Sequence, residues 1–89
     1  MITKRAEQFA RVWAMAMPDT TLPPVRTIFI WLSSFNDNLI ERALMQALPV
    51  AEKYQPKTDE ELLKLYKFIS ARLRIMRENE RENERTAAQ

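Results

Sequence analysis

The chain has 89 residues, of which 46% are hydrophobic and 29% are charged, and its formal net charge is +2. This length allows one domain at most, and no run of residues is long and apolar enough to predict a membrane span. The chain contains no cysteine, histidine or glycine, which excludes disulfides, thiolate metal sites, histidine-dependent catalysis and glycine-rich phosphate loops. Tight β-hairpin turns also favour glycine, so the composition predicts an all-α protein.

The first predicted helix runs from about Thr3 to Met17, and Pro18 ends it. Its apolar residues recur at near-helical spacing: Ile2, Ala6, Phe9, Ala10, Trp13 and Met17. Charged residues interrupt this pattern, so the segment lacks the continuous apolar core of a signal peptide, and we expect a cytoplasmic protein. A proline-containing linker follows over residues 19–24.

The second predicted segment, VRTIFIWLSSF, covers residues 25–35 and is compatible with a strand or a helix. Its apolar residues on one helical face are Val25, Ile28, Phe29, Leu32 and Phe35. We favour a helix because a lone strand would have no pairing partner. Ile30 and Trp31 make this helix apolar on more than one side, which predicts a central position or a contact with another chain.

The third predicted helix begins at a capping box formed by Asn38 and Glu41. An apolar stripe then continues to Leu48, and Pro49 either ends the helix or begins a short extra turn that reaches Tyr54.

The fourth predicted helix has the clearest pattern, with Thr58 and Glu61 as its capping box. Its apolar stripe consists of Leu62, Leu65, Tyr66, Ile69, Leu73 and Met76. We therefore expect a small all-α bundle of about four helices with a long, partly exposed C-terminal helix.

The charged sequence RENERENER occupies residues 77–85 and carries a net charge of −1. No apolar residue lies between Met76 and Ala87, so we expect nothing in this stretch to pack. The predicted organisation is a single helical domain over residues 1–76 and a charged, exposed helical or frayed tail over residues 77–89. Deletion of the tail is expected to leave the fold intact.

Basic residues on the fourth helix are candidates for contacts to the phosphates of a nucleic acid, and Tyr66 is a candidate for stacking on bases. The full set of nucleic-acid-binding candidates is Lys64, Lys67, Arg72, Arg74 and Tyr66. The alternative for the cations is an ordinary solvated helix face, because a net charge of +2 is small for a nucleic-acid-binding protein. The alternative for Tyr66 is a place in the core.

Ile30, Trp31 and Tyr54 are candidates for a protein-interaction surface, and Trp31 has the core as its alternative. The acidic residues fit exposed helix faces better than a catalytic pair, because Glu60 and Lys64 form a favourable i, i+4 pair. We therefore expect no enzyme activity, no cofactor and no metal.

Three patterns in the second, third and fourth predicted helices, covering about half the chain, resemble a known family. They are Trp31-Leu32-x-x-Phe35, Leu39-Ile40-x-x-Ala43-Leu44-x-x-Ala47-Leu48 and Tyr66-x-Phe68-Ile69-x-x-x-Leu73. Their order resembles the C-terminal domain of DnaD-type bacterial and phage replication proteins. No tryptophan follows Leu73, where Met76 stands nearest, and the family's glycine near the helix ends has no counterpart.

This resemblance implies a role in DNA contact or in assembly. The residues that it implicates are Tyr66, Phe68, Ile69, Lys64, Lys67, Arg72 and Arg74. The sequence thus predicts a small helical interaction protein of bacterial or phage origin that is associated with DNA during replication or remodelling. The alternative is a helical homo-oligomerisation or adaptor module with no nucleic-acid role.

Overall fold

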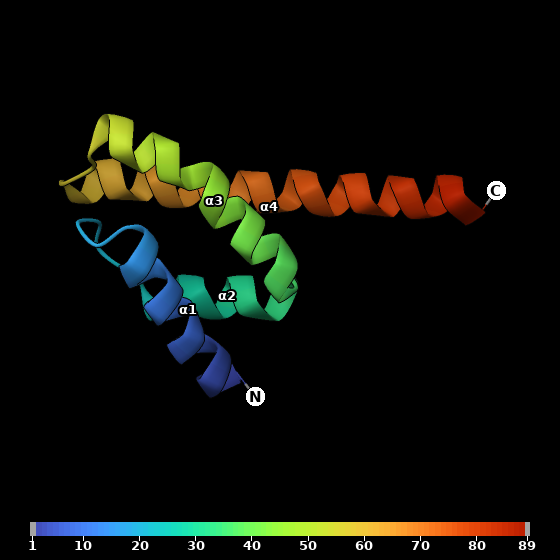
Figure 1. The fold of residues 1–89 in the computed structure, drawn as a ribbon, viewed down its shortest axis with the longest axis horizontal. Coiled ribbons are helices and arrows are strands. Elements are labelled where there is room, and N and C mark those ends of the chain that lie inside the picture. The colour runs from blue at the N-terminus through green and yellow to red at the C-terminus, as the bar shows by residue number, and fades with distance from the viewer. Residues whose placement is uncertain (1, 89) are drawn as a thin grey trace.

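The computed structural model describes the backbone of residues 2–88 and the side chains of residues 4–85. Over this range the chain forms four helices, α1 (Ile2–Ala16), α2 (Val25–Ser34), α3 (Asp37–Tyr54) and α4 (Asp59–Ala88), and no strand (Figure 1). The prediction of a small all-α bundle with a long last helix is confirmed. None of these helices is long and apolar enough to cross a membrane.

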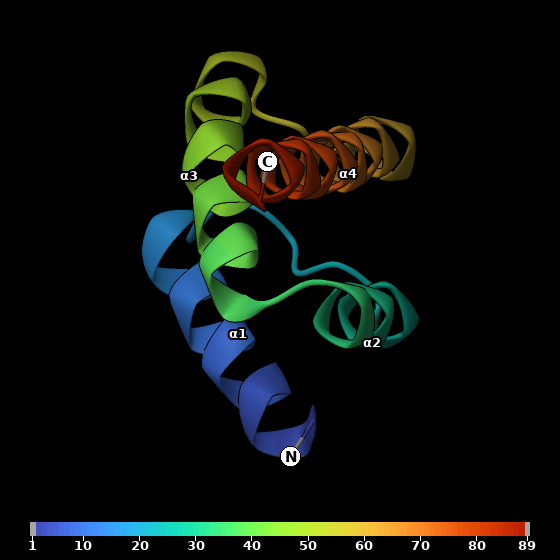
Figure 2. The ribbon, with the colours of Figure 1, turned by 90° about the vertical axis from the view of Figure 1, so that its right-hand side faces the viewer.

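Helix α4 sets the length of the molecule. Its 30 residues span about 45 Å at 1.5 Å per residue, and the longest dimension of the molecule is 47 Å. In Figure 1, α2 lies below α4 and runs in the same direction, while α3 crosses α4 diagonally. Figure 2 looks along α4 and shows α3 to its left and α1 and α2 below it, so no other helix covers the upper right side of α4.

The core is one cluster of apolar side chains from all four helices. Its largest fully buried members are Trp13, Trp31, Ile69 and Leu73. The rings of Phe9 and Trp31 have centroids 6.0 Å apart and join α1 to α2. Trp31 also donates a hydrogen bond from its indole N–H to the Ser70 hydroxyl at 2.9 Å, which joins α2 to α4. Buried indole nitrogens need such partners, so these contacts fix how the helices meet.

The face that α2 buries differs from the predicted one. Trp31 is buried beside Ile28 and Leu32, whereas Val25 and Phe29 are 65% and 42% exposed. The prediction was wrong for Val25 and Phe29 because α2 is rotated about its axis so that Trp31 reaches Ser70 on α4. A short helix that is apolar on several sides does not specify this rotation by its pattern alone.

The N-cap of α3 is Asn36, and the predicted capping box at Asn38 was wrong. The Asn36 side chain accepts a hydrogen bond from the backbone N–H of Leu39 at 2.9 Å. Helix α3 continues through Pro49 to Tyr54. Gln55 then ends it with a left-handed backbone (φ 45°), the conformation that commonly closes a helix.

The predicted capping box of α4 is confirmed. The Thr58 hydroxyl accepts from the Glu61 backbone N–H at 3.2 Å, and a Glu61 carboxylate oxygen accepts from the Thr58 backbone N–H at 3.1 Å. The same oxygen accepts from the Lys57 backbone N–H at 3.4 Å. These bonds favour the ionised carboxylate and lower the pKa of Glu61.

Packing of α4 extends past Met76, so the expectation that nothing in residues 77–85 packs was wrong at Arg77. The Arg77 guanidinium covers the Phe35 ring, and Arg77 Nη1 donates to the Ser34 carbonyl at 3.4 Å. Glu80 lies 3.5 Å from Arg42 of α3. Arginine packs in this way because its long apolar stem lies along apolar surface while its head stays polar.

Candidate functional site

The stretch from Leu62 to Arg77 on α4 carries five cations and no carboxylate. Lys64, Lys67 and Arg74 are exposed, and we call these three residues the cationic face. Lys67 and Arg74 are seven residues apart, so they lie on the same side of the helix about 10 Å apart along its axis. The cationic face therefore presents positive charge along one continuous helix.

Arg72 does not belong to the cationic face. Its side chain is half-buried, and its Nε donates to the Gln46 side-chain oxygen at 2.7 Å. The Gln46 amide in turn contacts the Met76 sulfur at 3.6 Å. Arg72 therefore joins α4 to α3, and its position suits a structural role.

Tyr66, a candidate for stacking on bases, lies in the core and is 8% exposed. Its hydroxyl donates to the Thr21 carbonyl at 2.7 Å, which ties α4 to the linker between α1 and α2. Burial, with a smaller contribution from Asp59, raises the pKa of Tyr66. The structure thus places Tyr66 where its ring packs against Trp13, away from the surface.

The predicted protein-interaction candidates do not form one surface. Trp31 is 2% exposed and belongs to the core, whereas Ile30 is 56% exposed. Tyr54 is 65% exposed at the end of α3, beside Lys53, whose Nζ lies 5.4 Å from its ring centre. Figure 1 shows that the end of α3 and helix α2 lie on different sides of α4. The exposed apolar surface of α2 instead consists of Ile30 with Val25 and Phe29.

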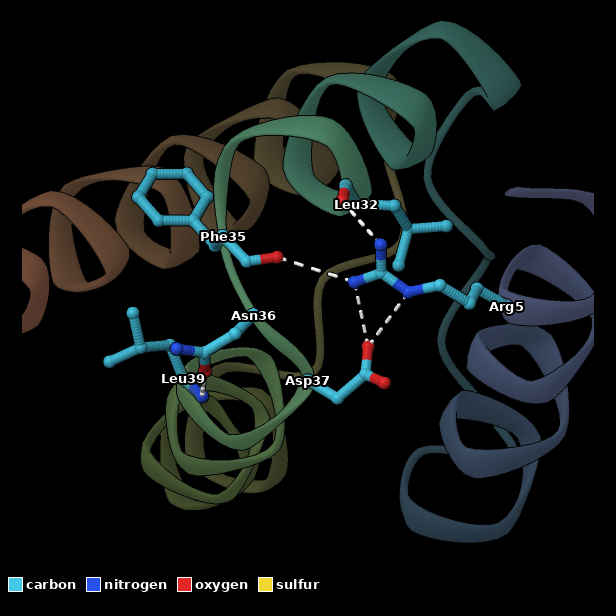
Figure 3. A network of polar contacts seen from close by, with 6 residues as sticks. All are labelled: Arg5, Leu32, Phe35, Asn36, Asp37 and Leu39. Carbon is cyan, nitrogen blue, oxygen red and sulfur yellow. Dashed lines mark hydrogen bonds and ion pairs between the residues drawn. The ribbon is translucent and has the colours of Figure 1, made fainter. Parts of the chain in front are cut away.

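A polar network around Arg5 connects α1 to the junction between α2 and α3 (Figure 3). Arg5 donates to the Leu32 carbonyl at 2.7 Å, to the Phe35 carbonyl at 3.3 Å and to an Asp37 carboxylate oxygen at 2.7 Å. The Leu32 carbonyl belongs to the last turn of α2 and the Phe35 carbonyl to its C-cap residue, where carbonyls lack intrahelical partners. Arg5 therefore caps α2 from another helix.

Two shallow grooves flank α3. The larger, of about 870 Å³, lies between residues 16–21 and the end of α3, and the smaller, of about 420 Å³, lies between α1 and α3. The smaller groove has apolar walls that include Phe9 and Ile40, and Lys4 and Glu41 also line it. Among the described residues, no three histidine, cysteine, aspartate or glutamate side chains are grouped so that they could hold a metal ion.

Sequence reasoning missed the roles of Arg5 and Arg77. Both act through contacts with residues more than 25 positions away, and no local spacing signals such a contact. The only local signal for Arg77 is its position one residue after the last apolar residue of the stripe.

Comparisons of the chain with protein-family models, with curated proteins and with solved structures found no match. The resemblance to DnaD-type domains rests on the residue pattern alone and stays a prediction.

Proposed function

We propose that the protein is a non-enzymatic helical interaction protein that binds the phosphate backbone of DNA through the cationic face of α4. The observation that carries this proposal is the concentration of positive charge on α4. Residues 62–77 contain five lysines and arginines and no aspartate or glutamate, although the net charge of the whole chain is only +2. Lysine and arginine on one exposed side of a helix are suited to phosphate contacts, which position a protein without reading sequence.

The buried part of α4 supports this use of its exposed side. Leu62, Ile69 and Leu73 anchor the helix in the core, and Arg72 braces it against α3. The cations thus project from a backbone that is held in place before any partner arrives. A helix held in this way loses little backbone freedom on binding.

Fluorescence anisotropy with labelled single-stranded and double-stranded DNA tests the proposal. We expect binding at about 50 mM salt that weakens steeply towards about 200 mM, because each phosphate contact releases counterions. Neutralising the cationic face with Lys64→Gln, Lys67→Gln and Arg74→Gln should weaken binding by tenfold or more and reduce the salt slope by about 2 to 3.

The matched control is Lys4→Gln, Arg11→Gln and Lys57→Gln, which removes the same charge from exposed positions elsewhere. It should retain most of the affinity. Absence of binding at micromolar protein and low salt would refute the proposal. Equal losses in the two triple variants would show that overall charge matters and the cationic face does not.

A second candidate function is supported by the exposed apolar residues of α2. Val25, Phe29 and Ile30 are 65%, 42% and 56% exposed on one ten-residue helix. Several exposed apolar side chains on one short helix are common at protein-interaction sites. On this proposal the chain is a helical adaptor whose α2 docks on another protein.

Size-exclusion chromatography with light scattering measures the molar mass of the chain in solution and so tests whether α2 docks on a second copy. Ile30→Asp should abolish any assembly formed through α2, whereas Met15→Asp on α1, where Met15 is 85% exposed, should leave it unchanged. Assembly that survives Ile30→Asp would exclude α2 as the contact.

A further inference from the structure

The uncovered side of α4 carries a second seven-residue pattern, separate from the buried stripe. Its positions alternate at spacings of three and four residues: Glu61, Lys64, Phe68, Ala71, Ile75, Glu78, Glu82 and Arg85. We call these eight residues the outer seam. Spacing of this kind lets one helix face another along its length. Phe68 is half-buried and Ile75 is 47% exposed, while the other six side chains are exposed.

The charges of the outer seam are arranged to complement a reversed copy of the same helix. When two copies of α4 lie antiparallel with their two-fold axis near Leu73, Lys64 faces Glu82 of the second copy. Glu61 then faces Arg85 of the second copy, and symmetry repeats both pairs. In a parallel arrangement lysine would face lysine and glutamate would face glutamate, which is unfavourable.

The same register brings the apolar part of the outer seam together. Ile75 faces Ala71 of the second copy, and the small Ala71 side chain lets the two helices approach closely at the centre. Phe68 lies one turn farther from the two-fold axis, opposite Glu78 of the second copy. Lys67, next to Phe68, supplies a positive partner for the Glu78 carboxylate. The centre of the contact is thus apolar and its ends are ionic, the common anatomy of a protein interface.

We propose that α4 pairs antiparallel with α4 of a second copy through the outer seam, forming a two-fold symmetric dimer. Figure 2 shows one side of α4 that no other helix covers, and the exposure of most outer-seam side chains assigns them to such an uncovered side. Exposed ion pairs contribute little to affinity, and the apolar centre is small. The dimer is therefore weak, and its ionic ends chiefly set orientation and register.

The pairing goes beyond the proposed DNA binding and does not depend on it. Lys64 belongs to both the cationic face and the outer seam, and Lys67 lies beside the outer seam, so DNA and the second copy compete for them. Arg74 is not one of the eight outer-seam residues.

Sedimentation equilibrium of the full chain from about 10 µM to about 1 mM, the range of a weak interface, tests the pairing. We expect a monomer–dimer equilibrium. Ile75→Glu should weaken association tenfold or more, and Lys64→Glu or Glu82→Lys alone should weaken it severalfold. The double variant K64E/E82K should recover wild-type association, because it exchanges the two charges of each pair.

Met45→Glu on α3 is the matched control, since Met45 is 72% exposed and lies outside the outer seam. It should associate as the wild type does, and circular dichroism should show that every variant keeps its helix content. A wild-type chain that is monomeric at every concentration would overturn the proposal, as would a double variant that stays as weak as its single parents.

The orientation is tested by a distance between spin labels. The chain has no cysteine, so Asn83→Cys gives one labelling site per copy. The antiparallel register places the two labels about 30 Å apart, since each lies ten residues from the axis at 1.5 Å per residue. A distance of about 10 Å, the separation of neighbouring helices, would indicate parallel pairing and overturn the proposal.

DNA binding by the same variants separates the two proposals. If the chain binds DNA but is monomeric in the absence of DNA, the pairing is refuted and the proposed function stands. If the chain dimerises, K64E/E82K restores association and no DNA is bound, the proposed function is refuted and the pairing stands.

Discussion

The guanidinium carbon of Arg77 lies 4.7 Å from the centre of the Phe35 ring, where α4 passes the junction between α2 and α3. Arg77 Nε is buried and has no hydrogen-bond partner, so the contact with the ring compensates for part of the lost hydration. This contact closes the α2–α3 end of the bundle against α4. Because of this contact, packing extends into residues 77–85, for which the composition predicted only a solvated tail.

We predict that Arg77→Ala lowers the free energy of unfolding by about 1 kcal/mol, through loss of the contact with Phe35 and of the packing of its stem. Arg81→Ala, in the same charged repeat at an exposed position, should change it by less than about 0.5 kcal/mol. Urea denaturation followed by circular dichroism measures both. Equal effects of the two substitutions would show that the contact with Phe35 does not stabilise the fold.

Arg5→Ala should lower the free energy of unfolding by about 1–2 kcal/mol, because it leaves two carbonyls at the end of α2 without their partner. This loss of stability is smaller than for a buried charged network because the Arg5 side chain is 32% exposed and that of Asp37 is 74% exposed. Arg5→Lys should rescue only part of the loss, since an ammonium group cannot reach both carbonyls and the carboxylate in the same planar geometry.

Arg11→Ala is the control for Arg5, because Arg11 is an exposed arginine on the same helix. Thermal melts of the three variants give the comparison. Full rescue by lysine would indicate that charge near Asp37 suffices and that the fork of hydrogen bonds in Figure 3 is dispensable.

Ser70→Ala removes the hydroxyl that accepts the hydrogen bond from the Trp31 indole N–H, which lies in the core between α2 and α4. We expect a loss of about 1–3 kcal/mol, the cost of leaving a buried donor unsatisfied. Ser70→Thr keeps the hydroxyl and should lose less, and Ser33→Ala at an exposed position of α2 should be nearly neutral. Tryptophan fluorescence during chemical unfolding reports on the site directly. A neutral Ser70→Ala would show that the indole N–H finds another partner.

The apolar stripe of α4 could be predicted from the sequence because its members, from Leu62 to Met76, recur at helical spacing. The Thr58–Glu61 box was also readable, since both of its members lie within one turn. Such features depend only on residues near one another in the chain. The all-α class could be predicted from the composition, because the chain has no glycine for tight β-hairpin turns.

Features that depend on distant residues could not be read. The rotation of α2 is set by Ser70, 39 positions from Trp31, and Val25 and Phe29 were misplaced for that reason. The separation of Arg72 from the cationic face required knowledge of Gln46 on α3, because Arg72 and Arg74 look alike in a helical pattern. The sequence thus located the cations of α4 but did not separate the structural cation from the exposed ones.

The capping box of α4 should make stability depend on pH. Hydrogen bonds from Thr58 and Lys57 lower the pKa of Glu61 in the folded state below its ordinary value of 4.5. A lowered folded-state pKa means that the ionised carboxylate stabilises the fold above about pH 4.5 and that this contribution is lost as the pH falls through the folded-state pKa. Glu61→Gln should be less stable than wild type at neutral pH, and the difference should shrink in acid.

Urea titrations of both proteins at several pH values from 7 down to about 3, below the ordinary carboxyl pKa, give that difference. Glu60→Gln, its exposed neighbour in the same turn, is the control, and its difference from wild type should change less with pH because Glu60 makes none of the capping bonds described for Glu61. A Glu61→Gln difference that stays constant across the range would show that the carboxylate charge is not what stabilises the start of α4, and that an uncharged acceptor serves there equally well.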